Sequence, residues 1–152
     1  PLQLKEVDLN AAVEEVFTLV GNQGAIQDVE LLKDAATLPP VEADFGQIRQ
    51  AFMNIAMNAL EAMPSGGRLV VTTRHLPEEG AVEVAFTDTG RGISPEEMKH
   101  IFDPFFTTKE KGTGLGLSVV YGIVERHKGQ VSVESEPGKG TRFVIRLPAA
   151  RR

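Results

Sequence analysis

The sequence contains no cysteine, which excludes disulfides and thiolate metal sites and suits a reducing cytosol. It also lacks any apolar run near the roughly 20 residues that span a bilayer, and its first residues do not form a signal peptide. Basic residues are outnumbered by acidic ones, 16 to 21, and the net charge of −5 argues against a nucleic-acid-binding module. These absences predict a cytoplasmic protein without direct membrane contact, whether or not a longer parent protein is membrane-anchored.

The composition is that of an ordinary globular protein, with 41% hydrophobic and 24% charged residues. A chain of 152 residues fits one domain, so a single domain is expected over residues 1–152. Such a chain buries roughly 70% of the surface that its unfolded form exposes.

Hydrophobic spacing predicts helices and strands that interleave without a regular βαβ alternation. The main helices are expected after Asp8, from Asp44 to about Met63, and from about Leu115 to His127. A capping box at 94–97 begins a short helix that is expected to end near Phe102. Strands are expected at 29–32, 68–75, 81–87, 131–135 and 141–147. This order predicts an α+β fold, a two-layer α/β sandwich. Its mixed, mostly antiparallel sheet would have about five strands, with about three helices covering one face.

The longest expected helix carries a polar strip beside its apolar stripe. Asn54 and Asn58 are four residues apart and share a face with Glu61, one turn further on. Side-chain amides there could bind a magnesium ion that is otherwise held by water and nucleotide phosphates. A solvated or internally hydrogen-bonded strip is the alternative.

The segment DTGRGI, residues 88–93, directly follows a strand of alternating apolar residues. The Asp88 carboxylate could accept a hydrogen bond from a flat ligand, and Gly90 and Gly92 would let the backbone approach it closely. An ordinary turn led by Asp88, with glycine at positive φ, explains the same residues.

Residues 109–117, KEKGTGLGL, form a glycine-rich segment that leads into a helix. Backbone amides at a helix N-terminus, together with Lys109 and Lys111, form an anion site suited to phosphates. The glycine spacing matches neither a Walker loop nor a dinucleotide fingerprint, and a flexible hinge is the alternative.

The preceding segment, FDPFFTTK at 102–109, places three phenylalanines in an expected mobile loop. Such apolar residues indicate a partner surface or a lid, or else ordinary packing against the domain. A further segment, GKGT at 138–141, predicts a tight turn between the two closing strands.

The order and spacing of five segments together resemble the N, G1, F, G2 and G3 boxes of sensor histidine kinases. The segments are NIAMNALEAM, DTGRGI, FDPFFTTK, GTGLGL and GKGTRF, and the resemblance extends over about residues 7–148. These boxes define the nucleotide site of a wider superfamily that includes gyrase, Hsp90 and MutL. The short lid and the letters FFTTK are most similar to the nitrogen-regulation branch. The resemblance implies a catalytic ATP-binding domain with the Bergerat fold.

The resemblance also implies ATP and Mg²⁺ as cofactors and assigns a role to each segment. Asn58 would be the magnesium ligand, Asn54 would lie near the triphosphate, and Lys109 or Lys111 would reach the phosphates. Asp88 would accept the adenine amino proton. The further residues implied to contact the nucleotide are Glu61, Ala62, Gly90, Gly92, Ile93, Phe102, Thr107, Thr108, Gly112, Thr113, Gly114, Leu115, Gly116, Leu117 and Thr141. His75, His100 and His127 are expected on the surface.

The residue one turn before Asn58 bears on the reaction. Hydrolases of this superfamily place a glutamate there as a general base, and Asn54 has no proton-accepting carboxylate. Phosphoryl transfer is therefore predicted rather than efficient hydrolysis, and the resemblance implies a histidine as the acceptor of the ATP γ-phosphate. No histidine here is followed by an acidic residue, so the acceptor is expected on a separate dimerisation and phosphotransfer domain, with a response regulator downstream.

Other functions remain open. The domain could be a nucleotide-gated binding module that presents Phe105 and Phe106 to a partner protein. An ATPase or a serine kinase of the same superfamily is a further alternative.

Overall fold

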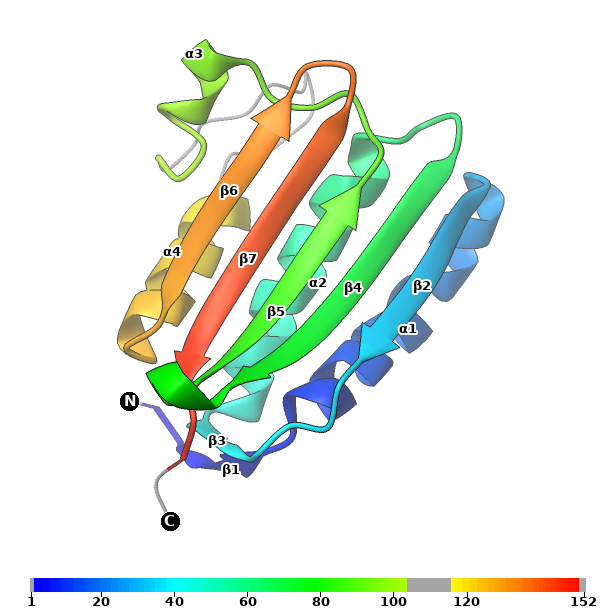
Figure 1. Ribbon diagram of the computed structural model, residues 1–152. Coiled ribbons are helices and arrows are strands. Elements are labelled where there is room, and N and C mark those ends of the chain that lie inside the picture. Colours follow the sequence, from blue (N-terminus) through cyan, green and yellow to red (C-terminus); the bar gives the residue numbers. More distant parts are fainter. Residues whose placement is uncertain (1, 104–115, 151–152) are drawn as a thin grey trace.

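The protein is described here by a computed structural model that covers residues 2–103 and 116–150. Its main sheet has five strands in the order β2-β4-β5-β7-β6 (Figure 1). The strands are β2 (Val29–Ala35), β4 (Gly67–Leu76), β5 (Ala81–Asp88), β6 (Gln130–Glu136) and β7 (Gly140–Pro148). β2 and β4 pair in parallel and the other neighbours are antiparallel, which confirms the prediction of a mixed, mostly antiparallel sheet.

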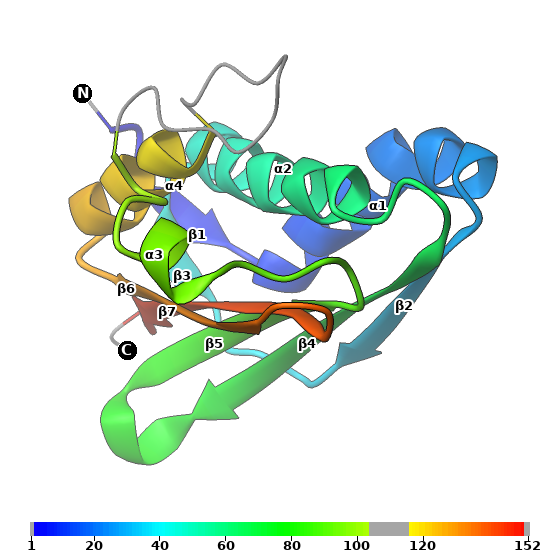
Figure 2. The same ribbon diagram turned by 90° about the horizontal axis from the view of Figure 1, so that it is seen from above.

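Three helices cover one face of this sheet: α1 (Leu9–Ile26), α2 (Phe45–Glu61) and α4 (Gly116–Arg126) (Figure 2). The N-caps of α1 and α2 are those expected, because Asp8 accepts a hydrogen bond from the backbone of Asn10 and Asp44 accepts one from Gln47. The result is the predicted two-layer sandwich. No helix within residues 2–103 and 116–150 is both long and apolar enough to cross a membrane.

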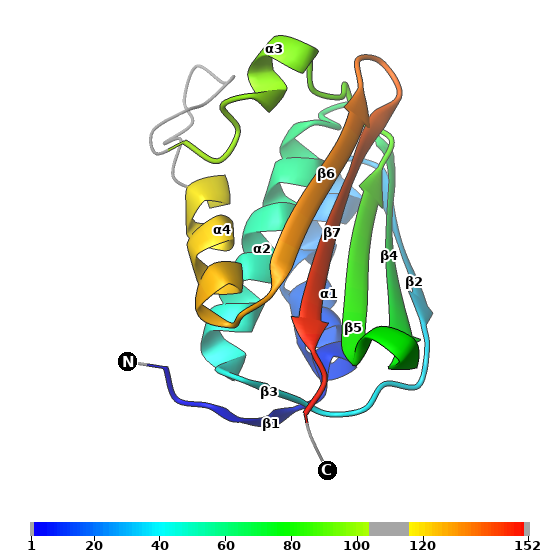
Figure 3. The same ribbon diagram turned by 60° about the vertical axis from the view of Figure 1, so that its left-hand side comes forward.

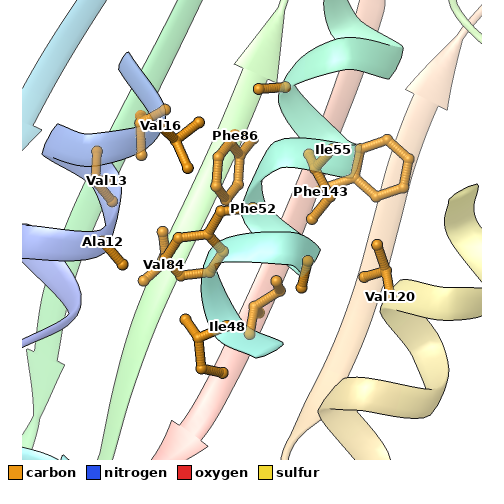
Figure 4. Packing of buried hydrophobic residues seen from close by; sticks show 14 of the residues in the cluster. Ala12, Val13, Val16, Ile48, Phe52, Ile55, Val84, Phe86, Val120 and Phe143 are labelled. Carbon is orange, nitrogen blue, oxygen red and sulfur yellow. The ribbon is translucent and has the colours of Figure 1, made fainter. Parts of the chain in front are cut away.

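The core lies between the helices and the sheet and is centred on α2 (Figure 4). Phe52 of α2 meets Phe86 of β5 edge to face, with ring centroids 5.3 Å apart. The apolar stripe expected along α2 is buried, as Ile48 and Ile55 show. In α4 the buried residues are Val120, Ile123 and Val124, whereas Val119 is only partly buried. The sequence spacing predicts Leu115, Val119 and Ile123 on the inner face of this helix; Ile123 is buried, Val119 packs against the core, and Leu115 lies outside the described residues.

Two short strands were not predicted from the sequence pattern. β1 (Lys5–Val7) pairs antiparallel with β3 (Val41–Ala43) in a separate two-stranded sheet (Figure 3). Strands of three residues are too short to show an alternating pattern. The helix after the capping box, α3 (Pro95–Met98), is also shorter than expected, although the box itself forms with Ser94 and Glu97. A one-turn 3₁₀ helix, η1 (Pro77–Glu79), connects β4 to β5.

His127 does not lie on the surface, contrary to the expectation from the sequence. It is 7% exposed, and its Nε2 accepts a hydrogen bond of 3.0 Å from the Asp44 backbone N–H. Its Nδ1 then donates to the carbonyl of Ile123, 2.8 Å away, so the imidazole is a neutral tautomer that joins the end of α4 to the start of α2. A histidine just after a helix gives no sequence signal for such a role.

Candidate functional site

Asp88 is the last residue of β5 and is 5% exposed. Its Oδ1 accepts hydrogen bonds from the backbone N–H groups of Gly90, at 2.8 Å, and Thr141, at 3.2 Å. Within the described residues both of its hydrogen bonds end on Oδ1, so Oδ2 is the oxygen available to a ligand. Burial raises the pKa of Asp88, and the hydrogen bonds from Gly90 and Thr141 oppose that rise. A donor group on a ligand would compensate the poorly solvated charge.

The two glycines after Asp88 bring backbone segments into close contact. A Cβ atom on Gly90 would lie 2.7 Å from both the Cβ and the carbonyl oxygen of Ala62, at the end of α2. Gly92 has a φ of +77°, and a Cβ there would lie 2.1 Å from the carbonyl oxygen of Glu136. The segment is therefore a turn with Gly92 at positive φ, and its backbone packs too tightly against Ala62 and Glu136 for side chains at positions 90 and 92. The close approach to a flat ligand stays a prediction.

The turn between β6 and β7 packs against the backbone of Asp88. Gly140 has a φ of +111°, and a Cβ there would lie 2.1 Å from the Asp88 carbonyl oxygen. Thr141 is buried beside Asp88, and its Oγ1 lies 2.8 Å from the Oγ of Ser135. Ser135 also accepts a hydrogen bond of 2.7 Å from the backbone N–H of Ile93. The predicted residues Gly90, Ile93 and Thr141 are thus brought together around Asp88.

Ser135 is a member of this group that the sequence did not reveal. No sequence motif marks this serine within its strand. Strand pairing gives the missing signal, because Ser135 lies opposite Thr141 and Thr141 lies opposite Asp88. The three residues form one row across β5, β7 and β6.

The polar strip of α2 faces the start of α4. Asn54 and Asn58 are partly buried, and Asn54 Nδ2 donates a hydrogen bond of 3.1 Å to the carbonyl oxygen of Gly116. A Cβ on Gly116 would lie 3.8 Å from Asn58 Nδ2. The structure therefore brings both asparagines to the helix end that follows the glycine-rich segment. Glu61, further along α2, is exposed.

Phe102 and Leu117 are partly buried against the core. The Phe102 ring lies 5.5 Å from the ring of Tyr121 in α4. Ordinary packing thus accounts for this first phenylalanine of the FDPFFTTK segment. The remaining predicted contacts lie outside the described residues: Phe105, Phe106, Thr107, Thr108, Lys109, Lys111, Gly112, Thr113, Gly114 and Leu115.

The fold and the residues around Asp88 can be compared with those of known protein families. Residues 43–151 match the family model described as histidine kinase-, DNA gyrase B-, and HSP90-like ATPase, and the chain belongs to this family. Among its relatives are sporulation kinase E of Bacillus subtilis (strain 168), 38% identical over 97% of this chain and 20% of that protein. Another is the sensor histidine kinase ZraS of Escherichia coli O157:H7, 41% identical over 97% of this chain and 32% of that protein. The chain thus spans a fifth to a third of these two relatives.

Solved structures agree in both fold and class. The catalytic domain of histidine kinase ThkA has a TM-score of 0.87 at 32% identity and covers 97% of this chain and 96% of that one. Full-length ShkA in complex with AMPPNP has a TM-score of 0.90 at 30% identity and covers 100% of this chain and 32% of that one. ThkA in complex with the response regulator TrrA has a TM-score of 0.81 at 28% identity, covering 97% of this chain and 42% of that one. These matches confirm the resemblance to the catalytic ATP-binding domain of sensor histidine kinases.

Proposed function

We propose that this chain binds ATP with Mg²⁺ and transfers the γ-phosphate to a histidine on a separate dimerisation domain, within a longer sensor kinase. The observation that carries the proposal is the geometry of Asp88. Its Oδ1 is held by the backbone of Gly90 and Thr141, and its Oδ2 remains for the ligand. An ionised carboxylate only accepts hydrogen bonds, so this oxygen suits the exocyclic amino group of adenine.

The residues around Asp88 explain how a base could lie close to the backbone. Gly90 packs directly on Ala62, and the Arg91 backbone N–H donates a hydrogen bond of 3.2 Å to the Ala62 carbonyl oxygen. A Cβ atom at position 90 would collide with Ala62 and would lie 3.0 Å from Asp88 Oδ1, so a side chain there would disturb the carboxylate. We expect these residues to orient the base and to exclude water from its amino edge.

Asn58 would hold the magnesium ion. The described residues contain no group of three histidine, cysteine or acidic side chains that could bind a metal. A single amide oxygen fits Mg²⁺, which keeps several waters and takes further ligands from nucleotide phosphates. When bound, the ion would neutralise phosphate charge in phosphoryl transfer.

One feature disfavours hydrolysis, and a second indicates that the acceptor histidine lies outside this domain. The side chain one turn before Asn58 is the amide of Asn54, which has no proton-accepting carboxylate and so cannot act as a general base. Its Nδ2 donates a hydrogen bond to the Gly116 carbonyl oxygen. His127 is an unsuitable acceptor within the chain, because both of its ring nitrogens are hydrogen-bonded in the interior. A histidine on another domain could serve as the accessible phosphate acceptor. The response regulator that ThkA binds suggests the class of downstream partner.

The test separates binding from transfer. ATP binding is measured by calorimetry with and without Mg²⁺, and we expect Asn58→Ala to remove mainly the magnesium dependence. The domain is then mixed with the dimerisation hairpin of its own parent kinase, and phosphohistidine is measured alongside phosphate release. Transfer with slow release is expected. Rapid ATP hydrolysis without an acceptor would identify an ATPase, and binding without any transfer would identify a nucleotide-gated binding module.

A further inference from the structure

Ser135 lies at the end of the main sheet where β5 ends and β6 turns into β7 (Figure 1). Its hydroxyl oxygen is within hydrogen-bonding distance of three groups, each in a different part of the site. These are the Ile93 backbone N–H at 2.7 Å, the Gly140 carbonyl oxygen at 2.9 Å and the Thr141 hydroxyl at 2.8 Å. A serine hydroxyl offers one proton and two lone pairs, so three bonds use its full capacity.

The directions of these bonds follow from the chemistry of the partners. The Ile93 N–H can only donate, and the Gly140 carbonyl can only accept. Ser135 therefore gives its single proton to Gly140 and accepts from Ile93. Its remaining lone pair must accept the proton of Thr141. The Thr141 hydroxyl is thus a donor toward Ser135, and its own lone pairs remain as acceptors toward any other group.

Thr141 lies next to the carboxylate that faces the ligand, because its backbone N–H binds Asp88 Oδ1 at 3.2 Å. The ionised Asp88 carboxylate accepts hydrogen bonds and cannot donate them. With Ser135 in place, two neighbouring side chains in this part of the site both present acceptors. An amino group satisfies such an edge, whereas a carbonyl oxygen would face acceptors without a proton between them.

We propose that Ser135 is a specificity-determining positioning residue, which orients the Thr141 hydroxyl as an acceptor and so favours 6-aminopurine over 6-oxopurine nucleotides. This inference rests on the proposed binding of ATP. Ser135 acts through Thr141 and need not touch the nucleotide itself.

The same hydroxyl also holds the backbone around the site. Through Ile93 it fixes the segment that follows Asp88, which is further joined to the β6–β7 turn by the Gly138 N–H bond of 2.7 Å to the Arg91 carbonyl oxygen. Loss of Ser135 would therefore weaken binding of every nucleotide to some extent. Selectivity between two nucleotides separates the orienting role from this structural one.

The experiment measures dissociation constants for ATP and ITP. Their bases differ at position 6, an amino group against a carbonyl oxygen, and at N1, an acceptor against an N–H donor; wild type and variants meet the same N1 difference, so a change in the ratio between them reports on the group that faces position 6. We expect wild type to prefer ATP and Ser135→Ala to reduce the ratio of the two constants about fivefold, the equivalent of one hydrogen bond. Without Ser135 the Thr141 hydroxyl can turn and donate to the carbonyl of ITP. Ser135→Thr keeps a hydroxyl and should keep the ratio. The matched control is Ser132→Ala, an exposed serine on the opposite face of the same strand.

A double-mutant cycle tests whether the effect passes through Thr141. Thr141→Val alone should reduce the ratio, and Ser135→Ala should change it no further in that background. An unchanged ratio in folded Ser135→Ala, or additive effects of the two changes, would overturn the inference while leaving ATP binding intact. If wild type and Asp88→Asn bound ATP alike, the nucleotide site and this inference would both be wrong.

Discussion

Replacing Asp88 by asparagine changes the charge of the site while keeping its shape. The amide oxygen can occupy the place of Oδ1 and accept from Gly90 and Thr141, but the NH₂ group then faces the adenine amino group. Turning the amide over places the NH₂ group against the two backbone N–H donors instead. Donors oppose donors in both orientations, so the variant has no good arrangement with ATP bound.

The size of the effect follows from these bonds. An unsatisfied buried donor costs about 1–3 kcal/mol, and loss of a hydrogen bond to a charged group costs about 1.5–3 kcal/mol. Together they predict that Asp88→Asn weakens ATP binding by at least roughly 100-fold. Isothermal titration calorimetry at neutral pH measures this directly. Asp34→Asn, which removes an equal charge from an exposed position on β2, should bind like wild type.

The unliganded variant should not lose stability. Because burial raises the pKa of Asp88, the folded state binds this proton more tightly than the unfolded state. Ionised Asp88 therefore lowers the stability of the free domain at neutral pH, and this cost diminishes as pH falls through the raised pKa. The Tm of Asp88→Asn without ATP should equal or exceed that of wild type. A lower Tm together with unchanged ATP affinity would refute the reasoning.

Three further results are expected. ATP affinity should fall as pH drops through the raised pKa of Asp88, because a protonated carboxyl presents a donor to the base. In calorimetry, the ATP dissociation constants of wild type and Asp88→Asn should therefore approach each other at low pH. A difference in affinity that stays constant with pH would contradict this. Glu83→Gln should lower the free energy of unfolding at pH 7, measured in urea, by about 1–2 kcal/mol. The reason is that Arg74 and Arg146 hydrogen-bond to Glu83 on the uncovered sheet face, and the partial exposure of both arginines keeps the effect moderate. Burial alone would raise the pKa of Glu83, but the hydrogen bonds and charges of these arginines lower it, so the contribution should persist at neutral pH and disappear as pH falls through the lowered pKa. His127→Phe should lower the free energy of unfolding by about 1–3 kcal/mol, because two hydrogen bonds are lost. His75→Phe, at an exposed position, should change it by no more than about 0.5 kcal/mol. Equal effects of the two changes would contradict the assigned role of His127.

The sequence predicted those elements whose pattern is long enough to read. The main helix α2 has an N-cap at Asp44 and a buried apolar stripe, and both are found as expected. Each strand of the main sheet is within a few residues of its predicted bounds. β1 and β3 were missed because three residues carry no periodicity. Strand pairing joins residues far apart in sequence, so the register across β5, β7 and β6 required the structure.

The candidate site and the residues that support the fold also include some that a sequence motif marks and others that only the structure identifies. Asp88, Gly90 and Gly92 belong to the segment DTGRGI, which the sequence marks as a candidate ligand site because a carboxylate and two glycines follow a strand. Ser135 and His127 carry no such mark, because their roles come from neighbours 6 and 83 residues away along the chain. A polar side chain that satisfies buried backbone groups can be identified only once those groups have been located.

The close contact between Gly140 and Asp88 has a consequence for enzyme turnover. The β6–β7 turn already meets the end of β5 in the free protein, so the base-binding end of the site is preorganised and its ordering costs little on binding. The low ordering cost applies to binding of the adenine ring, which both ATP and ADP carry. ADP therefore gains as much from it as ATP does, and we expect ADP to be a competitive inhibitor. Preference for the triphosphate must come from contacts to the phosphates, and release of ADP is a candidate for the slow step of the catalytic cycle.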